Sequence, residues 1–532
     1  MSFSPDTLSR LSSGFPFRPV TGFVFLILIP ALWLSSCGPT TETIVVDRQA
    51  RAVEDDEEEE VVEEDELRVL KIGESNRIRS MDPLFAVNTA TKRMIQLSYE
   101  GLVKLDEEEN AVPAAASRWE VSDDSLTYTF FLRDDLFFHD DESFSQGRGR
   151  KVNSRDVKRV FERMASRDVP PNAAELFMDN IRGFESYFLE QRDVYFDEDR
   201  QIDSISGIEA KNDSTIVFHL SEQDPAFLSY LATPYAVIYP REPFRFRDDG
   251  LHSHAVGTGP FRYSTTVGDS IHIFNRNESF NRKDDEGRTL PRAHRVELMS
   301  GIREAHLYSH FNRGVINILP DPGPGNIQRM ITSENELKDP YRDKYKLQAQ
   351  ANPEPLVIRY NQNNRFNIGR PEAAAVLRHV TGDTLYKELG VPSLEITYQD
   401  DEYSQSNIAR VFNRFGEDAP DRLVFAYQQD ILPRTLSETI YDLMDDNLRV
   451  DLIQRRVFSR DIFLYLDYIP VYTSGQQPER QPQEVMRLES DRYLLKDKTV
   501  DNVKLNTLSW WMDLTQVRKT AEPAERAETA GR

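Results

Sequence analysis

The sequence predicts a mixed α/β (α+β) fold with more than one lobe. Strand-like and helix-like segments are interspersed along the chain, and no internal repeat is evident. The 532 residues, 39% of them hydrophobic, also exceed what one core normally holds. The single cysteine, Cys37, excludes an internal disulfide and cysteine-rich zinc or iron–sulfur sites.

Residues 1–36 are typical of an export signal. Arg10 and Arg18 precede an apolar stretch at 22–34, which is shorter than the ~20 residues that a membrane-spanning helix needs. The run LSSCG around Cys37 resembles the lipobox of bacterial lipoproteins, a resemblance that implies lipidation of this cysteine. The alternative interpretation is a short membrane anchor with an incidental cysteine.

Residues 37–66 are predicted to form a disordered acidic linker. Between 54 and 66 there are eleven acidic residues and no basic one, which is nearly half of the net charge of −24. Like charges extend such a segment, so we expect a spacer between a membrane and a folded domain. Continuous acidic runs lack the geometry of a calcium loop. The excess of acidic residues also argues against nucleic acid as a partner.

The folded part begins with an alternating strand at 67–73, followed by a turn at 80–83 and helical spacing from 91 to 102. Two strands are predicted at 119–122 and 127–132, with Trp119 and Phe130 in the core. A helix is predicted at 154–164 with Ser154 as its N-cap, and a strand at 215–220. Further on, the pattern predicts a helix at 436–444 and a strand at 450–453.

Six motifs in this order resemble the peptide/nickel-type extracellular solute-binding proteins of ABC transporters, bacterial family 5. The resemblance covers about 67–361, and its motifs are SMDP at 80–83, YEGLV at 99–103, the stretch 113–133, FFHD at 137–140 with DV at 156–157, VGTGPF at 256–261 and YN at 360–361. Gly257 and Gly259 in the fifth motif are interpreted as a tight scaffold turn rather than a ligand contact.

The resemblance implies a two-lobed periplasmic binding protein-like fold, of type II and cluster C-like, whose lobes close by a hinge. The expected parts are lobe I at 67–350 with the family's insertion subdomain, lobe II at 351–475, a return to lobe I at 476–514 and a disordered tail at 515–532. Lobe II is expected to be reduced, because only about 150 residues separate Asn361 from Leu514.

Peptide binders of the resembled family hold the ligand's amino group with an aspartate in a DYxxP-like stretch of the second lobe. The matching candidate here is Asp467, followed by Pro470. Four further residues could face the cleft, since aromatic and amide groups suit such pockets, but they fit core and strand positions equally well: Tyr360, Asn361, Tyr465 and Tyr472.

No motif typical of an enzyme or a metal site stands out in the sequence. It contains no HExxH, GxSxG or GxxxxGK[ST] motif, so no catalytic group is identified and no cofactor is expected. His252 and His254 could be two metal ligands on one face of a strand, but loop histidines are commoner, and no metal site is predicted.

The sequence therefore predicts an exported solute-binding protein, lipid-anchored at the periplasmic or extracellular face of a membrane. A monomer would capture a peptide or similar small solute between two lobes and deliver it to an ABC permease and its ATPase. The alternative is a degenerate member without a transported ligand, acting as a sensor or envelope interaction protein. An enzyme is the least favoured class.

Overall fold

The computed structural model describes residues 68–351, 354–382, 384–392, 394–398, 404–416, 421–427, 430–445, 448–454, 464–468 and 483–520. All of them belong to one unit, Glu59–Arg532. The predicted signal peptide, the acidic linker and most of the predicted tail lie outside the described residues. Within the described ranges, no helix combines the length and apolar character needed to cross a membrane.

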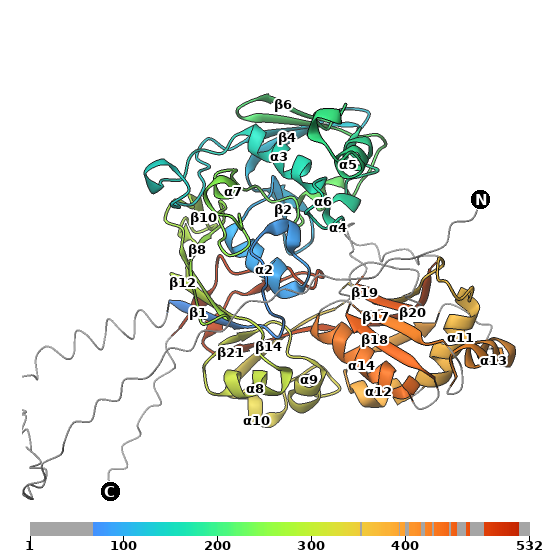
Figure 1. The fold of residues 1–532 in the computed structure, drawn as a ribbon. Coiled ribbons are helices and arrows are strands. Elements are labelled where there is room, and N and C mark those ends of the chain that lie inside the picture. The colour runs from blue at the N-terminus through green and yellow to red at the C-terminus, as the bar shows by residue number, and fades with distance from the viewer. Residues whose placement is uncertain are drawn as a thin grey trace, which may run out of the picture. The chain divides into compact units, whose positions relative to one another are not determined.

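A seven-stranded sheet begins with the predicted first strand and gathers strands from both ends of the described chain (Figure 1). Its order is β14 (Tyr345–Gln350), β21 (Arg492–Asp497), β13 (Ile318–Leu319), β1 (Val69–Gly73), β12 (Arg295–Met299), β9 (Ile271–Arg276) and β8 (Phe261–Val267). β1 runs parallel to β12, with Val69 opposite Arg295 and Gly73 opposite Met299. The carboxyl ends of these two strands therefore meet at one edge of the sheet.

Helices α8 (Glu304–Asn312), α9 (Pro324–Met330) and α10 (Asp339–Arg342) lie beside β14 and β21 in Figure 1. Leu307 and Phe311 of α8 and Ile327 of α9 share a buried cluster with Tyr345 of β14 and Tyr493 of β21. Burial of these apolar side chains fixes α8 and α9 against the sheet.

A separate antiparallel sheet contains the strands predicted at 119–122, 127–132 and 215–220. Its order is β4 (Ala116–Val121), β5 (Thr127–Leu132), β7 (Thr215–His219) and β6 (Ile208–Asn212). Phe130 is fully buried, and its ring meets that of Phe218 edge to face at 5.8 Å between centroids. Trp119 is only partly buried and packs against this core.

The helix predicted at 154–164 is confirmed as α3 (Ser154–Met164), but its predicted cap is wrong. Asn153 is the N-cap: its side chain accepts from the Arg155 N–H at 3.0 Å, and Asp156 accepts from the Asn153 N–H at 3.0 Å. This reciprocal pair is a capping box. Ser154 instead donates its hydroxyl to the carbonyl of Asn212, which ties α3 to the end of β6.

The glycine turn at 256–261 packs against the end of α2 (Thr89–Ser98), as expected for a scaffold element. A Cβ on Gly259 would lie 2.5 Å from the carbonyl carbon of Ser98 and 2.6 Å from the Tyr99 nitrogen. One on Gly257 would lie 2.1 Å from the Ser98 carbonyl oxygen. Both positions require glycine because two backbone segments approach too closely for a side chain. α2 ends here, four residues before the predicted limit at 102.

A six-stranded sheet follows in the second half of the chain. Its order is β16 (Glu395–Tyr398), β20 (Glu484–Glu489), β15 (Leu356–Tyr360), β19 (Leu464–Tyr468), β17 (Leu423–Tyr427) and β18 (Val450–Gln454). β17 is parallel to both β18 and β19, so their carboxyl ends share an edge. Helices on one face bury its apolar side chains; they are α11 (Arg370–Thr381), α12 (Thr384–Leu389), α13 (Gln405–Phe415) and α14 (Ile431–Asp445).

The chain passes between these two sheets twice. It leaves the seven-stranded sheet after β14, at Gln350, and enters the six-stranded sheet with β15. It returns between Glu489 of β20 and Arg492 of β21. The sequence predicts this return at 475/476. In the structure, β20 (Glu484–Glu489) still pairs with β15 and β16, so the chain leaves the second sheet only after residue 489.

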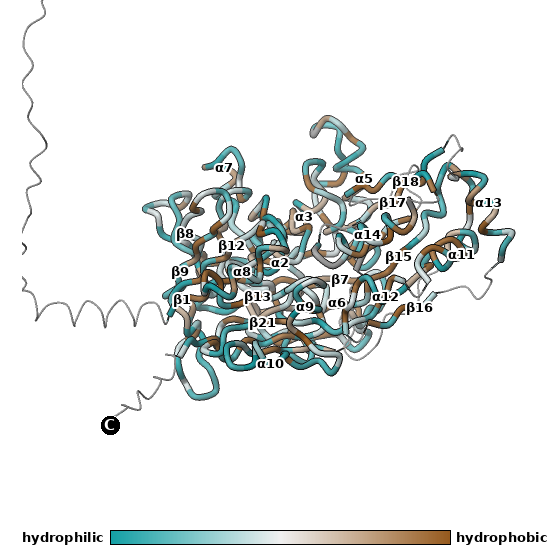
Figure 2. The backbone as a smooth tube through the Cα atoms, turned by 90° about the horizontal axis from the view of Figure 1, so that it is seen from below, coloured by the Kyte–Doolittle hydropathy of each residue, from teal (hydrophilic) through white to brown (hydrophobic). Residues whose placement is uncertain are grey.

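In Figure 2, hydrophobic residues follow the strands and helices, and hydrophilic residues predominate in the peripheral loops. The remaining elements are short or peripheral: β2 (Val103–Leu105), β3 (Ala111–Pro113), α4 (Asn172–Glu175), α5 (Phe184–Asp193), α6 (Phe227–Leu231), α7 (Pro243–Phe246), β10 (Arg282–Lys283), β11 (Thr289–Leu290), β22 (Val500–Asp501), β23 (Lys504–Leu505), β24 (Met512–Asp513), β25 (Arg518–Lys519) and three 3₁₀ turns, Pro83–Phe85, Ser145–Gly147 and Asp197–Asp199.

Candidate ligand-binding site

The carboxyl ends of the parallel strands of both sheets open onto one cavity of about 640 Å³. Ligands in open α/β sheets bind outside the carboxyl ends of the strands. Its lining residues fall into three groups. Four follow β1 (Ser75, Asn76, Arg77, Arg79), and four follow β12 (Gly301, Ile302, Arg303, Glu304). The others are Tyr427 of β17, Asp430 between β17 and α14, Arg434, Thr435 and Glu438 of α14, and Gln454 of β18.

The size and polarity of this cavity suit a small polar solute. Ligand pockets usually measure roughly 300–1,000 Å³. Two other cavities in the described residues measure about 100 and 70 Å³ and are lined largely by apolar side chains. We therefore take the polar cavity as the candidate site.

Asp430 joins the two halves of this site. It lies three residues after β17, and its Oδ1 accepts from the Thr89 N–H at 2.9 Å and the Thr89 hydroxyl at 2.8 Å. Asn76 Nδ2 also donates to this oxygen, at 2.9 Å. The residue is 2% exposed. Its other carboxylate oxygen, Oδ2, has no hydrogen-bond partner among the described residues.

Burial dominates the ionisation of this carboxyl. Desolvation raises the pKa of Asp430 from 3.8 to about 7, although the hydrogen bonds from Thr89 and the positive charge of Lys92 act in the opposite direction. The negative charge of Asp321 adds to the rise. The group therefore titrates close to neutral pH and would become fully ionised on meeting a ligand cation.

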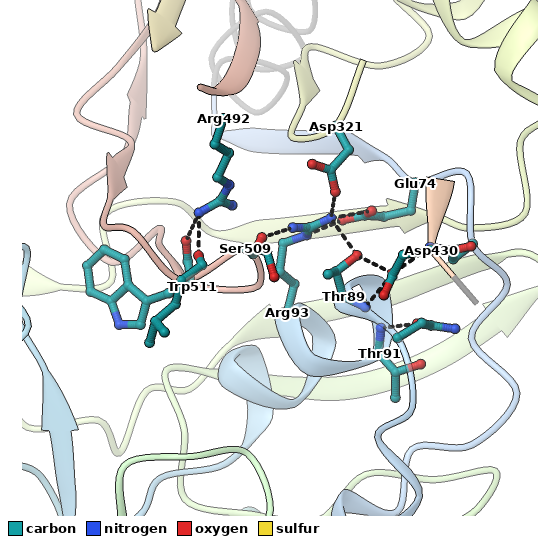
Figure 3. Close-up of polar contacts among 12 residues, drawn as sticks. Glu74, Thr89, Thr91, Arg93, Asp321, Asp430, Arg492, Ser509 and Trp511 are labelled. Atoms are coloured by element: carbon teal, nitrogen blue, oxygen red, sulfur yellow. Dashed lines mark hydrogen bonds and ion pairs between the residues drawn. The ribbon is translucent and has the colours of Figure 1, made fainter. Parts of the chain in front are cut away.

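A cluster of ion-paired residues around Arg93 lies beside Thr89. The Arg93 guanidinium donates to Glu74 Oε1 at 2.7 Å, to Asp321 Oδ2 at 2.5 Å and to the Ser509 carbonyl at 2.8 Å (Figure 3). Burial alone would lower the pKa of Arg93, but Glu74 and Asp321 raise it above its ordinary value. Arg93 and Glu74 are each 2% exposed, so the pair is a fixed structural element beside Thr89.

The acidic residues of the cavity wall are engaged by groups of the protein itself. Glu304 Oε1 accepts from the Gly325 N–H at 3.1 Å, and burial raises the pKa of this carboxyl. Glu438 accepts from Arg434 Nε at 2.9 Å, one helical turn away on α14. Among the described lining residues, Asp430 Oδ2 is the only buried carboxylate oxygen without a hydrogen-bond partner.

The residues that the sequence predicts for the site either lie away from the cavity or fall outside the described residues. Asp467 belongs to β19, where its backbone pairs with Val357; its side chain is outside the described residues, as are Cys37 and Tyr472. Tyr360 ends β15 and packs against the core of the six-stranded sheet. Tyr465 is 3% exposed and shares a small cluster with Ala426.

Asn361 shapes the loop after β15. Its side-chain oxygen accepts from the Asn363 N–H at 3.0 Å, and its carbonyl accepts from Asn364 Nδ2 at 2.6 Å. Tyr360, Asn361 and Tyr465 do not line the cavity at the strand ends. The structure thus brings none of these three to Asp430.

Asp430 is the residue that sequence reasoning missed. It begins the run Asp430-Ile431-Leu432-Pro433, which has the same Asp-x-x-Pro spacing as Asp467 to Pro470 and also follows a strand. A search for every such run in the second half of the chain would have given both candidates, together with Asp321 to Pro324. The choice between them depends on the contact with Thr89, 341 residues away.

The two histidines considered as metal ligands have separate partners. His252 Nδ1 lies 2.8 Å from Ser80 Oγ, and His254 Nε2 lies 3.0 Å from Asp141 Oδ2. They stand in a loop rather than on a strand. Across the described ranges there is no group of three or more His, Cys, Asp or Glu side chains that could hold a metal ion.

Comparisons with known proteins agree with this geometry. The family model for the bacterial extracellular solute-binding proteins, family 5 (middle), matches residues 110–378. Di/tripeptide-binding protein 1 of Pseudomonas aeruginosa is 29% identical over 205 residues, 38% of this chain and 34% of the relative. The peptide transport periplasmic protein SapA of Salmonella typhimurium is 34% identical over 158 residues, 29% of this chain and 26% of the relative. The matched segment thus spans between a quarter and a third of these relatives.

Solved structures share the fold over most of the chain. Haemophilus influenzae OppA, in complex with a peptide, has a TM-score of 0.65 at 13% identity and covers 86% of this chain and 99% of its own. Listeria monocytogenes OppA bound to peptide has a TM-score of 0.62 at 14% identity, with the same coverage. These alignments do not confirm the predicted reduction of the second lobe. The fold is that of a periplasmic binding protein, and the chain belongs to the bacterial extracellular solute-binding proteins, family 5.

Proposed function

We propose that this chain is the solute-binding component of an ABC importer, which captures an amine-bearing small solute such as a short peptide and delivers it to the permease. The observation that carries the proposal is the buried carboxylate of Asp430, with one unengaged oxygen, on a cavity lined by the ends of both sheets. A desolvated carboxylate attracts an ammonium group far more strongly than one in open water.

The two sheets would belong to two lobes that close over the solute. Asp430, from the six-stranded half, already contacts Thr89 and Asn76 of the seven-stranded half. A solute ammonium at Asp430 Oδ2 would add a contact to the same carboxylate and stabilise the closed arrangement. Asp467 stays a second candidate for the amine anchor.

The relatives support the biological setting. The Salmonella relative is described as periplasmic and as serving peptide transport, and the Pseudomonas relative as binding di- and tripeptides. We propose by analogy that this chain is exported, acts as a monomer and is lipid-anchored through Cys37. The members of this family are binding proteins, which agrees with the lack of a catalytic motif. The alternative role as a sensor rests on a reduced second lobe, which the comparisons do not confirm.

The test is isothermal titration calorimetry of the full-length protein with free di- to pentapeptides and their N-acetylated forms at pH 7.5. We expect binding of free peptides and a loss of at least ten-fold in affinity on acetylation, because the ammonium is removed. Asp430→Asn keeps the shape and acceptor oxygen of the side chain and should remove this preference. Asp467→Asn is the matched control. Absence of binding by every peptide would overturn the proposal.

A further inference from the structure

Three arginines surround the cavity without a carboxylate partner. Arg77, Arg79 and Arg303 are exposed, line the cavity, and form no ion pair within the described part of the chain. Acidic residues outnumber basic ones by 89 to 65 in this protein, so acidic partners for surface arginines are abundant. A group of arginines left unpaired at the mouth of a cavity therefore points to an anion from outside the protein.

The loops that carry these arginines are fixed to one another. The Gly301 N–H donates to the Asn76 carbonyl at 3.1 Å, and the Ile302 N–H donates to the Glu74 carbonyl at 3.0 Å. Gly301 adopts a positive φ of 75°, and a Cβ there would lie 3.7 Å from Arg77 Nε. The guanidinium of Arg77 thus lies against the loop that leads to Arg303.

Helix α8 adds to the positive potential at this place. Arg303 is its N-cap, and the helix runs for nine residues from Glu304. The amino end of a helix carries a partial positive charge that favours an anion nearby. The acidic residue at the start of this helix, Glu304, is engaged by the Gly325 N–H, and Glu438 is paired with Arg434.

We propose that the solute carries, in addition to its amino group, an oxyanion that binds Arg77, Arg79 and Arg303. This inference rests on the proposed function and deepens it: the solute class becomes an acidic amine compound, such as a short peptide with an acidic side chain. A carboxylate and a phosphate share the required chemistry, because both accept paired N–H groups from a guanidinium. The ammonium would bind Asp430 at one wall and the oxyanion would bind the arginines at another.

The experiment compares three tripeptides by titration calorimetry with the full-length protein: Ala-Glu-Ala, Ala-Gln-Ala and Ala-phosphoserine-Ala. Each is amidated at its C-terminus, so that the middle side chain supplies the only oxyanion. We expect the acidic peptides to bind about 10- to 100-fold more tightly than the glutamine peptide, as charge-assisted hydrogen bonds to arginine generally give. Higher affinity for both acidic peptides than for the glutamine peptide indicates a general oxyanion site. Higher affinity for one of them alone identifies the carboxylate or the phosphate as the group that the arginines bind.

Variants connect the gain to the arginines. The double change Arg77→Gln and Arg303→Gln should reduce the preference for the acidic peptides over Ala-Gln-Ala to less than about three-fold. Arg313→Gln, which follows the opposite end of α8, is the matched control. Equal binding of all three peptides by the unmodified protein would overturn the oxyanion site and leave the proposed function standing. Binding of none of them, and of none of their free-acid forms, would overturn the proposed function itself.

Discussion

Asp430 and Thr89 are separated by 341 residues, yet the carboxylate of the first accepts both the backbone N–H and the hydroxyl of the second. Thr89 is the first residue of α2, whose N-cap is Asn88, so the aspartate accepts from the first N–H of a helix that belongs to the other half of the molecule. A carboxylate at the amino end of a helix is stabilised by the helix dipole. The same contact therefore joins two parts of the protein and holds a buried carboxylate where a ligand cation can bind it.

The first prediction concerns the pH dependence of ligand binding. Because burial raises the pKa of Asp430 to about 7, the carboxyl is largely neutral at pH 5.5 and cannot pair with an ammonium. We expect the affinity for a free-amine peptide to fall about 25-fold between pH 7.5 and 5.5, the ratio of ionised fractions for such a group. Calorimetry at several pH values measures this.

Lys92 and Asp321 also face Asp430, and Asp430→Asn leaves both of them in place. The fall in peptide affinity between pH 7.5 and 5.5 should therefore disappear in Asp430→Asn. A pH dependence that persists unaltered in this variant would assign the titration to another group.

The second prediction concerns stability without ligand. The folded-state pKa of Asp430 lies above its ordinary value of 3.8, so the folded protein binds the proton more tightly than the unfolded chain. Its contribution to stability is complete below pH 4 and is lost as the pH rises to 7 and beyond. Urea unfolding of the unmodified protein and of Asp430→Asn should show this difference. If the two free energies of unfolding stay parallel from pH 4 to 8, Asp430 does not titrate in this range.

The third prediction concerns the ion pair of Arg93 with Glu74. Removing one member leaves a buried charge without its partner, so Arg93→Met should lower the free energy of unfolding by about 3–5 kcal/mol. Arg342→Met is the control, because Arg342 pairs with Glu336 at 2.9 Å on the surface, where such pairs contribute ~1 kcal/mol or less. Similar losses for the two variants in urea unfolding would contradict a structural role for the Arg93 cluster.

Local patterns determined which elements could be predicted. The helix at 154–164 has a full apolar face, and Val157, Val160 and Phe161 are all buried in the structure. Its cap was assigned one residue late, since Asn153 and Ser154 are both good N-caps and only the side-chain geometry separates them. The sequence also predicts the glycine turn at 256–261 correctly, because two backbone segments can approach this closely only where the residue is glycine.

The site depends on contacts that no local pattern contains. Asp430 and Asp467 begin runs of the same spacing, and only the packing of α2 against the start of α14 places the first on the cavity. The arginines of the cavity come from two separate loops, after β1 and after β12, which meet because these strands are parallel neighbours. That pairing joins residues more than two hundred positions apart, beyond the reach of periodicity.

The fourth prediction concerns the anchor proposed at Cys37, which lies outside the described residues. If the cysteine carries a lipid, Cys37→Ser should release the protein from the membrane fraction into the soluble exported fraction, because a lipid chain is then absent. Fractionation of cells followed by immunoblotting measures this, with Ser36→Ala as the control change next to it. Retention of Cys37→Ser in the membrane fraction would argue instead for an uncleaved apolar anchor at 22–34.

The fifth prediction concerns Gly259, where the turn touches the end of α2. A methyl group there would lie 2.5 Å from the Ser98 carbonyl carbon, so the helix end or the turn must shift. Such overpacking typically costs about 1–3 kcal/mol. We therefore expect Gly259→Ala to lower the free energy of unfolding by about 1–3 kcal/mol. Gly325→Ala is the control, since the nearest atom would be Glu304 Oε1 at 3.4 Å, an ordinary contact.

Because α2 also presents Thr89 to Asp430, a shifted helix should weaken peptide binding together with stability in Gly259→Ala. A variant that loses stability but binds peptide with unchanged affinity would show that the two ends of α2 are not coupled. If Gly259→Ala and Gly325→Ala are equally stable, the turn tolerates a side chain and the close approach does not constrain the fold.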